Sequence, residues 1–281
     1  MKKVWTMLCT LMMVCCFISC ENNETLIPDM EEETGSRTLN SEIQGFIEKA
    51  RYGNSDAYKA LAECYRDGNG VEQSNINAIY MYMLYCEKVG KSDMAVLNFF
   101  EADSSISILL ELLLFTSSVD TINKEKLAQL QKVSPAEAKA FSMLAMYISD
   151  KKDDNFMKDL QEAEKEGSEM AVILQAMCYE EHGPKEEYHE FLLRVVDKYP
   201  FLYKGLANIC TEKYVETNDF SYVQKELEYM YNIDKYGMLS HRQANHLWTI
   251  YDYFSQKGLL QYDEAEISRL KKIMEKDKKI K

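Results

Sequence analysis

The chain has 281 residues, with 46 acidic and 33 basic side chains and a formal net charge of −13. This acidic balance argues against a nucleic-acid-binding protein, because neutralising phosphates requires an excess of Lys and Arg. With four prolines, eleven glycines and no alternating runs of Val and Ile, the composition predicts an all-helical fold.

The first 19 residues have the pattern of a signal peptide. Two lysines precede an apolar stretch over 4–18, which is shorter than the roughly 20 residues of a membrane-spanning helix. The stretch ends in FISC, which resembles the bacterial lipobox, with Phe17 where Leu is usual. The resemblance implies that Cys20 is acylated and becomes the mature N-terminus. The alternative is an ordinary signal peptide or an N-terminal spanning helix.

Residues 20–39 form a predicted acidic, flexible tether. Six carboxylates, Pro28 and Gly35 occur here among few apolar residues, so the segment cannot bury enough surface to order itself. Acidic residues after a lipidated cysteine also resemble surface-export signals of some Gram-negative lipoproteins, although a solvated spacer explains them equally. We therefore expect a lipoprotein of the cell envelope, anchored by its lipid to the outer membrane and facing either the periplasm or the cell surface.

Residues 57–90 have the spacing of a two-helix repeat, AYKALAECYRDGNGVEQSNINAIYMYMLYCEKVG. Small and apolar residues recur at helical spacing, and the glycines of the turn GNGV (68–71) permit positive φ. The pattern resembles the Sel1-like repeat, a relative of the tetratricopeptide repeat. Ala62 replaces a family glycine, and Tyr85-Cys86 replaces two alanines. The resemblance implies stacked antiparallel helix hairpins that form an α-solenoid.

The rest of residues 40–281 shows a more degenerate version of this repeat, weakest over 101–134. Ser134-Pro135-Ala136-Glu137 has the pattern of a helix capping box, and Gly183-Pro184 marks a helix boundary. The apolar stretch 106–115 is too short to span a membrane and predicts a buried helix.

Four cysteines follow Cys20, namely Cys64, Cys86, Cys178 and Cys210. In an antiparallel hairpin that turns near residue 70, the first two are offset by about 13 Å along the helices, which argues against a disulfide between them. Small packing residues are the expected role of these cysteines.

The sequence lacks a nucleophile elbow, a phosphate loop and a complete His-Glu-x-x-His motif. Cys178, His182 and His189 are spaced like metal ligands, but Gly183-Pro184 separates them and a fourth ligand is missing. A thiolate–imidazolium pair of Cys178 and His182 is the enzymatic alternative. We expect a non-enzymatic protein without a metal or cofactor.

A binding surface on the concave face of the first helices is the expected functional site. By analogy with its repeat family, the chain is predicted to bind a protein or peptide. The candidate side chains are Lys59, Glu63, Arg66, Asn98, Lys139, Gln175, Lys204 and Asn208. The alternative is a carbohydrate-binding lipoprotein that uses Trp248 and Tyr251, whose rings would otherwise belong to the core.

Overall fold

The computed structural model describes residues 41–100, 104–115, 122–153, 155–261 and 263–276. Within these ranges the regular elements are thirteen α-helices and two 3₁₀ helices, with no strand. This confirms the predicted all-helical fold. Cys20, the signal peptide and the tether lie outside the described residues. Over the part of the chain that is described, no helix combines the length and apolarity needed to cross a bilayer.

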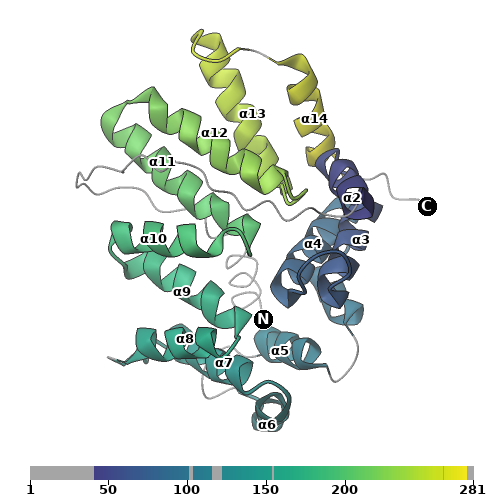
Figure 1. Ribbon diagram of the computed structural model, residues 1–281, viewed down its shortest axis with the longest axis vertical. Helices are drawn as coiled ribbons and strands as arrows, with labels where there is room; N and C mark the ends of the chain where they lie inside the picture. Colours follow the sequence, from purple (N-terminus) through teal and green to yellow (C-terminus); the bar gives the residue numbers. More distant parts are fainter. Residues whose placement is uncertain (1–40, 101–103, 116–121, 154, 262, 277–281) are drawn as a thin grey trace.

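Consecutive helices pack against one another, most extensively α3 with α4 and α11 with α12 (Figure 1). The elements in chain order are α2 (Ser41–Arg51), α3 (Ser55–Asp67), α4 (Asn75–Val89), η1 (Asp93–Phe99), α5 (Ser105–Phe115), α6 (Lys124–Val133), α7 (Pro135–Ile148), α8 (Phe156–Lys165), α9 (Glu169–His182), α10 (Lys185–Val195), η3 (Pro200–Leu202), α11 (Tyr203–Thr217), α12 (Phe220–Asp234), α13 (His241–Gln256) and α14 (Glu264–Met274). The apolar α5 is largely buried, and α9 ends where Gly183-Pro184 predicted.

The α3–α4 hairpin has the predicted turn. Gly68 and Gly70 adopt φ of 70° and 75°, a region that costs glycine little. Helices α3 and α4 end in the same way. After α3, the Asn69 main-chain N–H donates to the Cys64 oxygen (3.0 Å), and after α4 the Lys91 main-chain N–H donates to the Cys86 oxygen (2.9 Å). The two cysteines therefore occupy the last turns of two helices joined by one turn, and both are buried and outside any disulfide. The expectation of no disulfide between them is confirmed.

The predicted capping box at Ser134 is wrong. Ser134 joins α6 directly to α7, and its side chain makes no capping hydrogen bond. The Glu137 carboxylate instead accepts from the Ser168 hydroxyl (2.7 Å) and the Glu169 main-chain N–H (2.9 Å) at the start of α9. The sequence pattern assigns the Glu137 carboxylate to the start of its own helix, α7. In the structure this carboxylate instead caps α9.

Helix α4 lies against several later parts of the chain. Ten of its fifteen residues are buried. Its contacts from N- to C-terminus are Ile76 N–H with Glu169 (3.1 Å), Asn77 with the main-chain oxygen of Lys198 (2.8 Å), the Tyr80 ring with Phe201 (4.8 Å between centroids), and Lys88 with the main-chain oxygen of Lys272 (2.6 Å). The chain thus curves around helix α4, and α14 returns beside α2 (Figure 1).

Candidate functional site

Four of the predicted partner-binding side chains lie on α3, on η1 and at the start of α7, at or near the surface. Lys59 and Glu63 are about half exposed and form a 3.7 Å ion pair. Asn98 is exposed, whereas the half-buried Lys139 pairs with Glu162 at 3.2 Å. Such exposed pairs contribute little to stability, so these side chains are available for contacts with a partner.

Arg66 is more constrained than its neighbours on α3. Its guanidinium donates to the Asp67 carboxylate at 2.7 Å and to the main-chain oxygen of Phe99 at 3.2 Å. It also lies 4.8 Å from the centre of the Phe99 ring. Arg66 therefore holds η1 against α3, which is a structural role.

Of the remaining predicted residues, Gln175 on α9 and Lys204 on α11 are buried, and Asn208 on α11 is partly buried. Gln175 is 1% exposed and donates to Glu164 at 2.8 Å, and Lys204 is 6% exposed. Gln175 and Lys204 lie on the sides of α9 and α11 that neighbouring helices cover. Gln175 and Lys204 are therefore not part of an accessible concave surface, contrary to the sequence-based expectation.

Asn208 belongs to a polar cluster around Glu180 between α9 and α11. Burial raises the pKa of Glu180 to about 7, with further contributions from Glu181 and Glu212 and an opposing hydrogen bond from Asn208. Glu181 accepts a hydrogen bond from the Tyr147 hydroxyl. Glu180 is therefore a titratable carboxyl group within the packing of α9 against α11.

The two alternative sites are less accessible than their sequence patterns suggest. Trp248 is half-buried against the core, and the Tyr251 hydroxyl is hydrogen-bonded to that of Tyr231. Cys178 is 8% exposed, and burial raises its pKa to about 12, so the thiol is protonated at neutral pH. Across the described residues, no three His, Cys, Asp or Glu side chains are grouped to hold a metal ion.

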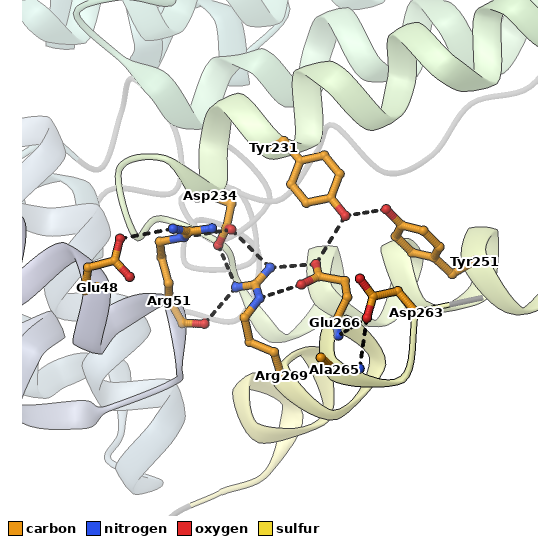
Figure 2. A network of polar contacts seen from close by, with 9 residues as sticks. All are labelled: Glu48, Arg51, Tyr231, Asp234, Tyr251, Asp263, Ala265, Glu266 and Arg269. Carbon is orange, nitrogen blue, oxygen red and sulfur yellow. Dashed lines mark hydrogen bonds and ion pairs between the residues drawn. The ribbon is translucent and has the colours of Figure 1, made fainter. Parts of the chain in front are cut away.

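A buried ionic network joins α2 to α14 (Figure 2). The Asp234 carboxylate, 1% exposed, accepts from Arg51 of α2 and from Arg269 of α14, each at 3.0 Å. Arg269 also donates to Glu266 at 2.7 Å, and Glu266 accepts from the Tyr231 hydroxyl at 3.2 Å. Because each buried charge has an opposite charge and several hydrogen bonds, removing one partner would leave the others uncompensated.

An open groove of about 660 Å³ lies next to this network, where α14 meets the α2–α3 turn. We call it the seam groove; its lining residues are Glu48, Lys49, Tyr52, Gly53, Asn54, Ser55, Lys88, Lys272 and Glu275. The Tyr52 side chain is 54% exposed, and the Lys272 ammonium lies 5.6 Å from the centre of its ring. An exposed aromatic ring among lysines in an open groove is suited to holding an extended ligand.

Sequence reasoning missed the seam groove because its two sides are far apart in the chain. Arg269 and Arg51 are 218 residues apart, and neither belongs to a local motif. The exposed Tyr52, in a turn beside a glycine, was the one available signal, but a single exposed aromatic residue is common on protein surfaces.

No family model, no curated protein and no solved structure matches this chain.

Proposed function

We propose that this protein is a lipid-anchored scaffold of the cell envelope, without enzymatic activity, that binds a protein or peptide through a helical-repeat surface. The seam groove is the observation that carries the proposal. It is open, has room for part of an extended chain, and combines an exposed aromatic ring with both charged and neutral hydrogen-bonding side chains.

The finer description of the fold belongs to the same proposal. We infer an α-solenoid of Sel1-like hairpins that has closed on itself. Support comes from the packing of consecutive helices and from the two left-handed glycines of the α3–α4 turn. The contacts of α4 with four later segments distinguish it from an open array, in which each repeat touches only its neighbours.

Anchoring is tested on Cys20. In a Gram-negative host, the full-length protein is expected to label with an alkynyl fatty acid and to fractionate with membranes. Cys20→Ala should abolish both signals, whereas the matched variant Cys16→Ala, within the apolar stretch, should retain both. Membrane association of Cys20→Ala at the wild-type level would overturn the lipoprotein proposal.

The scaffold role is tested by crosslinking the anchored protein in cells and identifying what co-purifies. A stoichiometric protein partner is the expected result. Its absence, together with glycan binding that disappears in Trp248→Ala, would replace the scaffold with the carbohydrate-binding alternative.

A further inference from the structure

We propose that the C-terminal end of α13 rests on the lipid bilayer, with the exposed Tyr253 and Leu259 side chains in the headgroup region. This inference rests on the proposed lipid anchor, because that anchor holds the domain beside a bilayer. It goes further by assigning the face of the domain that touches the lipid. We call this face the α13 tip, and it consists of Tyr214, Val215, Phe220, Tyr253, Lys257 and Leu259.

Exposed apolar side chains gather at the α13 tip. Five large apolar side chains are exposed over the described residues, and three of them are Val215 (67%), Leu259 (51%) and Tyr253 (48%). The other two, Tyr52 and Val133, belong to the α2–α3 turn and to α6. The end of α13 lies at the top of Figure 1, at one end of the long axis. The tip is therefore placed where a flat surface can meet it.

The α13 tip has a rigid base, which is the buried ring of Phe254. The rings of Tyr214, Phe220 and Tyr253 lie 5.5, 5.2 and 4.9 Å from it, measured between centroids. Leu259 is held there as well, because its main-chain N–H donates to the Phe254 oxygen at 2.9 Å. Residues of α11, α12 and α13 thus meet in one apolar surface, and ordering it costs little further conformational entropy when it meets lipid.

The charge of the chain favours this face for contact with a bilayer. At a net charge of −13, most of the domain is repelled by headgroup phosphates. The stretch 253–261, YFSQKGLLQ, has one lysine and no acidic residue. Carboxylates that border the tip have partners within the protein: Asp252 accepts from Gln256 (2.9 Å), Asp219 caps α12, and Glu216 pairs with Lys213 (3.4 Å).

Tyr253 and Lys257 have the chemistry of side chains that lie at a membrane–water boundary. The Lys257 ammonium lies 4.2 Å from the centre of the Tyr253 ring and donates to its hydroxyl. Tyrosine suits this boundary because one end of its side chain is apolar and the other forms hydrogen bonds. A lysine beside it can extend its ammonium to the phosphates while its methylene groups stay among apolar atoms.

The length of chain before α2 lets the tip reach the bilayer. Residues 21–40 separate the proposed lipid on Cys20 from α2. A chain of this length spans up to about 70 Å when extended. A compact domain of this size has a radius of gyration of about 18 Å. Every face of the domain is therefore within reach of the bilayer, and the surface chemistry decides which face is in contact.

The small size of the apolar surface also favours lipid over a second copy of the chain. A stable protein interface buries about 800 Å² on each partner, with some 20–30 residues a side and matched shapes. The α13 tip offers only a few exposed apolar side chains. A bilayer needs no matched shape, and a few aromatic and aliphatic side chains add to the affinity that a lipid chain already provides.

The test reconstitutes the full lipidated protein into phosphatidylcholine vesicles, with a nitroxide label on Gln256→Cys in the last turn of α13. Gln131→Cys, exposed on α6, carries the matched label. The native cysteines of the domain are buried, and the unsubstituted protein gives the labelling background. Power saturation measures collisions with oxygen, which is enriched in lipid, and with a water-soluble nickel chelate. We expect the label at 256 to be shielded from nickel and the label at 131 to be fully exposed.

A second pair of variants tests the side chains themselves. Tyr253→Ser/Leu259→Ser should return the label at 256 to the nickel exposure of the label at 131. Val133→Ser removes an equally exposed apolar side chain of α6 and should leave the label at 256 shielded. All variants keep the lipid, so all should float with the vesicles, and circular dichroism checks their folds.

Equal nickel exposure at 256 and 131 in protein that floats with vesicles would overturn the contact and leave the lipid anchor standing. Spin–spin broadening at 256 that disappears on dilution with unlabelled protein would show that a second copy covers the tip, which also overturns the inference. Protein that does not float would overturn both the inference and the anchor on which it rests.

Discussion

The Arg269 guanidinium donates a 2.8 Å hydrogen bond to the main-chain oxygen of Arg51, 218 residues earlier in the chain. The same guanidinium and that of Arg51 share the buried Asp234 carboxylate. This arrangement joins α2 to α14 through charges rather than through a hydrophobic contact alone, and it stands beside the groove proposed to bind the partner.

Asp234→Ala should reduce the free energy of unfolding by about 3–5 kcal/mol, because it leaves two arginines without their shared buried counter-charge. Urea denaturation followed by circular dichroism measures the change. Glu48→Ala is the control, since it removes only an exposed pair with Arg51 and should cost under about 1 kcal/mol. Equal losses in the two variants would show that the network contributes no more than a surface pair.

Glu137→Ala should destabilise the protein by about 1–3 kcal/mol, because its carboxylate satisfies donors at the start of α9. Ser134→Ala should change stability by less than about 0.5 kcal/mol, since its side chain caps nothing. A larger loss of stability in Ser134→Ala than in Glu137→Ala would instead support the capping box predicted from the sequence.

Gly205→Ala should cost about 1–3 kcal/mol. An added Cβ would lie 2.6 Å from the Tyr188 hydroxyl oxygen and 2.7 Å from a methyl carbon of Leu192, where α10 meets α11. Gly45→Ala, in the exposed middle of α2, meets nothing within 4 Å and should stabilise by about 0.5–1 kcal/mol. Thermal unfolding of the two variants compares the signs directly, and a loss at both positions would contradict the packing account.

Glu180→Gln should remove part of the pH dependence of stability. Burial raises the Glu180 pKa from 4.5 to about 7, so the folded state binds a proton that the unfolded state has released across that window. The contribution of Glu180 to stability therefore falls as pH rises from about 4.5 to about 7 and then levels off. The groups that face it are Glu181, Glu212, Lys204 and Asn208.

Relative to wild type, Glu180→Gln should gain on the order of 2 kcal/mol at pH 8 compared with pH 5. Urea denaturation at the two pH values measures this difference. Glu187→Gln, an exposed change on the neighbouring α10, serves as the control. A gain that is the same at both pH values would show that the carboxyl does not titrate in this range.

Native Cys64, Cys86, Cys178 and Cys210 should resist alkylation. All four are buried, and burial raises the pKa of Cys178 and of Cys210 to about 12. Intact-mass analysis after iodoacetamide treatment should show these four thiols modified only when urea is present. Rapid labelling of Cys178 in the folded protein would revive the catalytic-thiol alternative.

Local features of the fold were predictable, because neighbouring residues determine them. The turn at Gly68 and Gly70, the helix boundary at Gly183 and the burial of the cysteines follow from spacing and composition. The capping role of Glu137 was not predictable, because its acceptor oxygens serve a helix that begins more than thirty residues later.

The candidate site was beyond sequence reasoning for the same reason. Nothing near Lys49 in the sequence indicates that Lys272 lies across a groove from it. The concave-face prediction assumed an open array, whereas Gln175 and Lys204 are buried among neighbouring helices. The contacts of α14 with α2 and α4 carry no periodic signal in the sequence.

The contact between α14 and the α2–α4 region has a consequence for how such a chain can change length. An open array tolerates the gain or loss of one hairpin, because only the flanking repeats must re-form their contacts. Here an added hairpin would displace α14, and Lys88 would no longer reach its main-chain oxygens. The contact of α14 with α2 and α4 thus fixes the number of helices between them, and we expect sequence variation in this protein to occur by substitution and in the loops rather than by duplication of a helix pair.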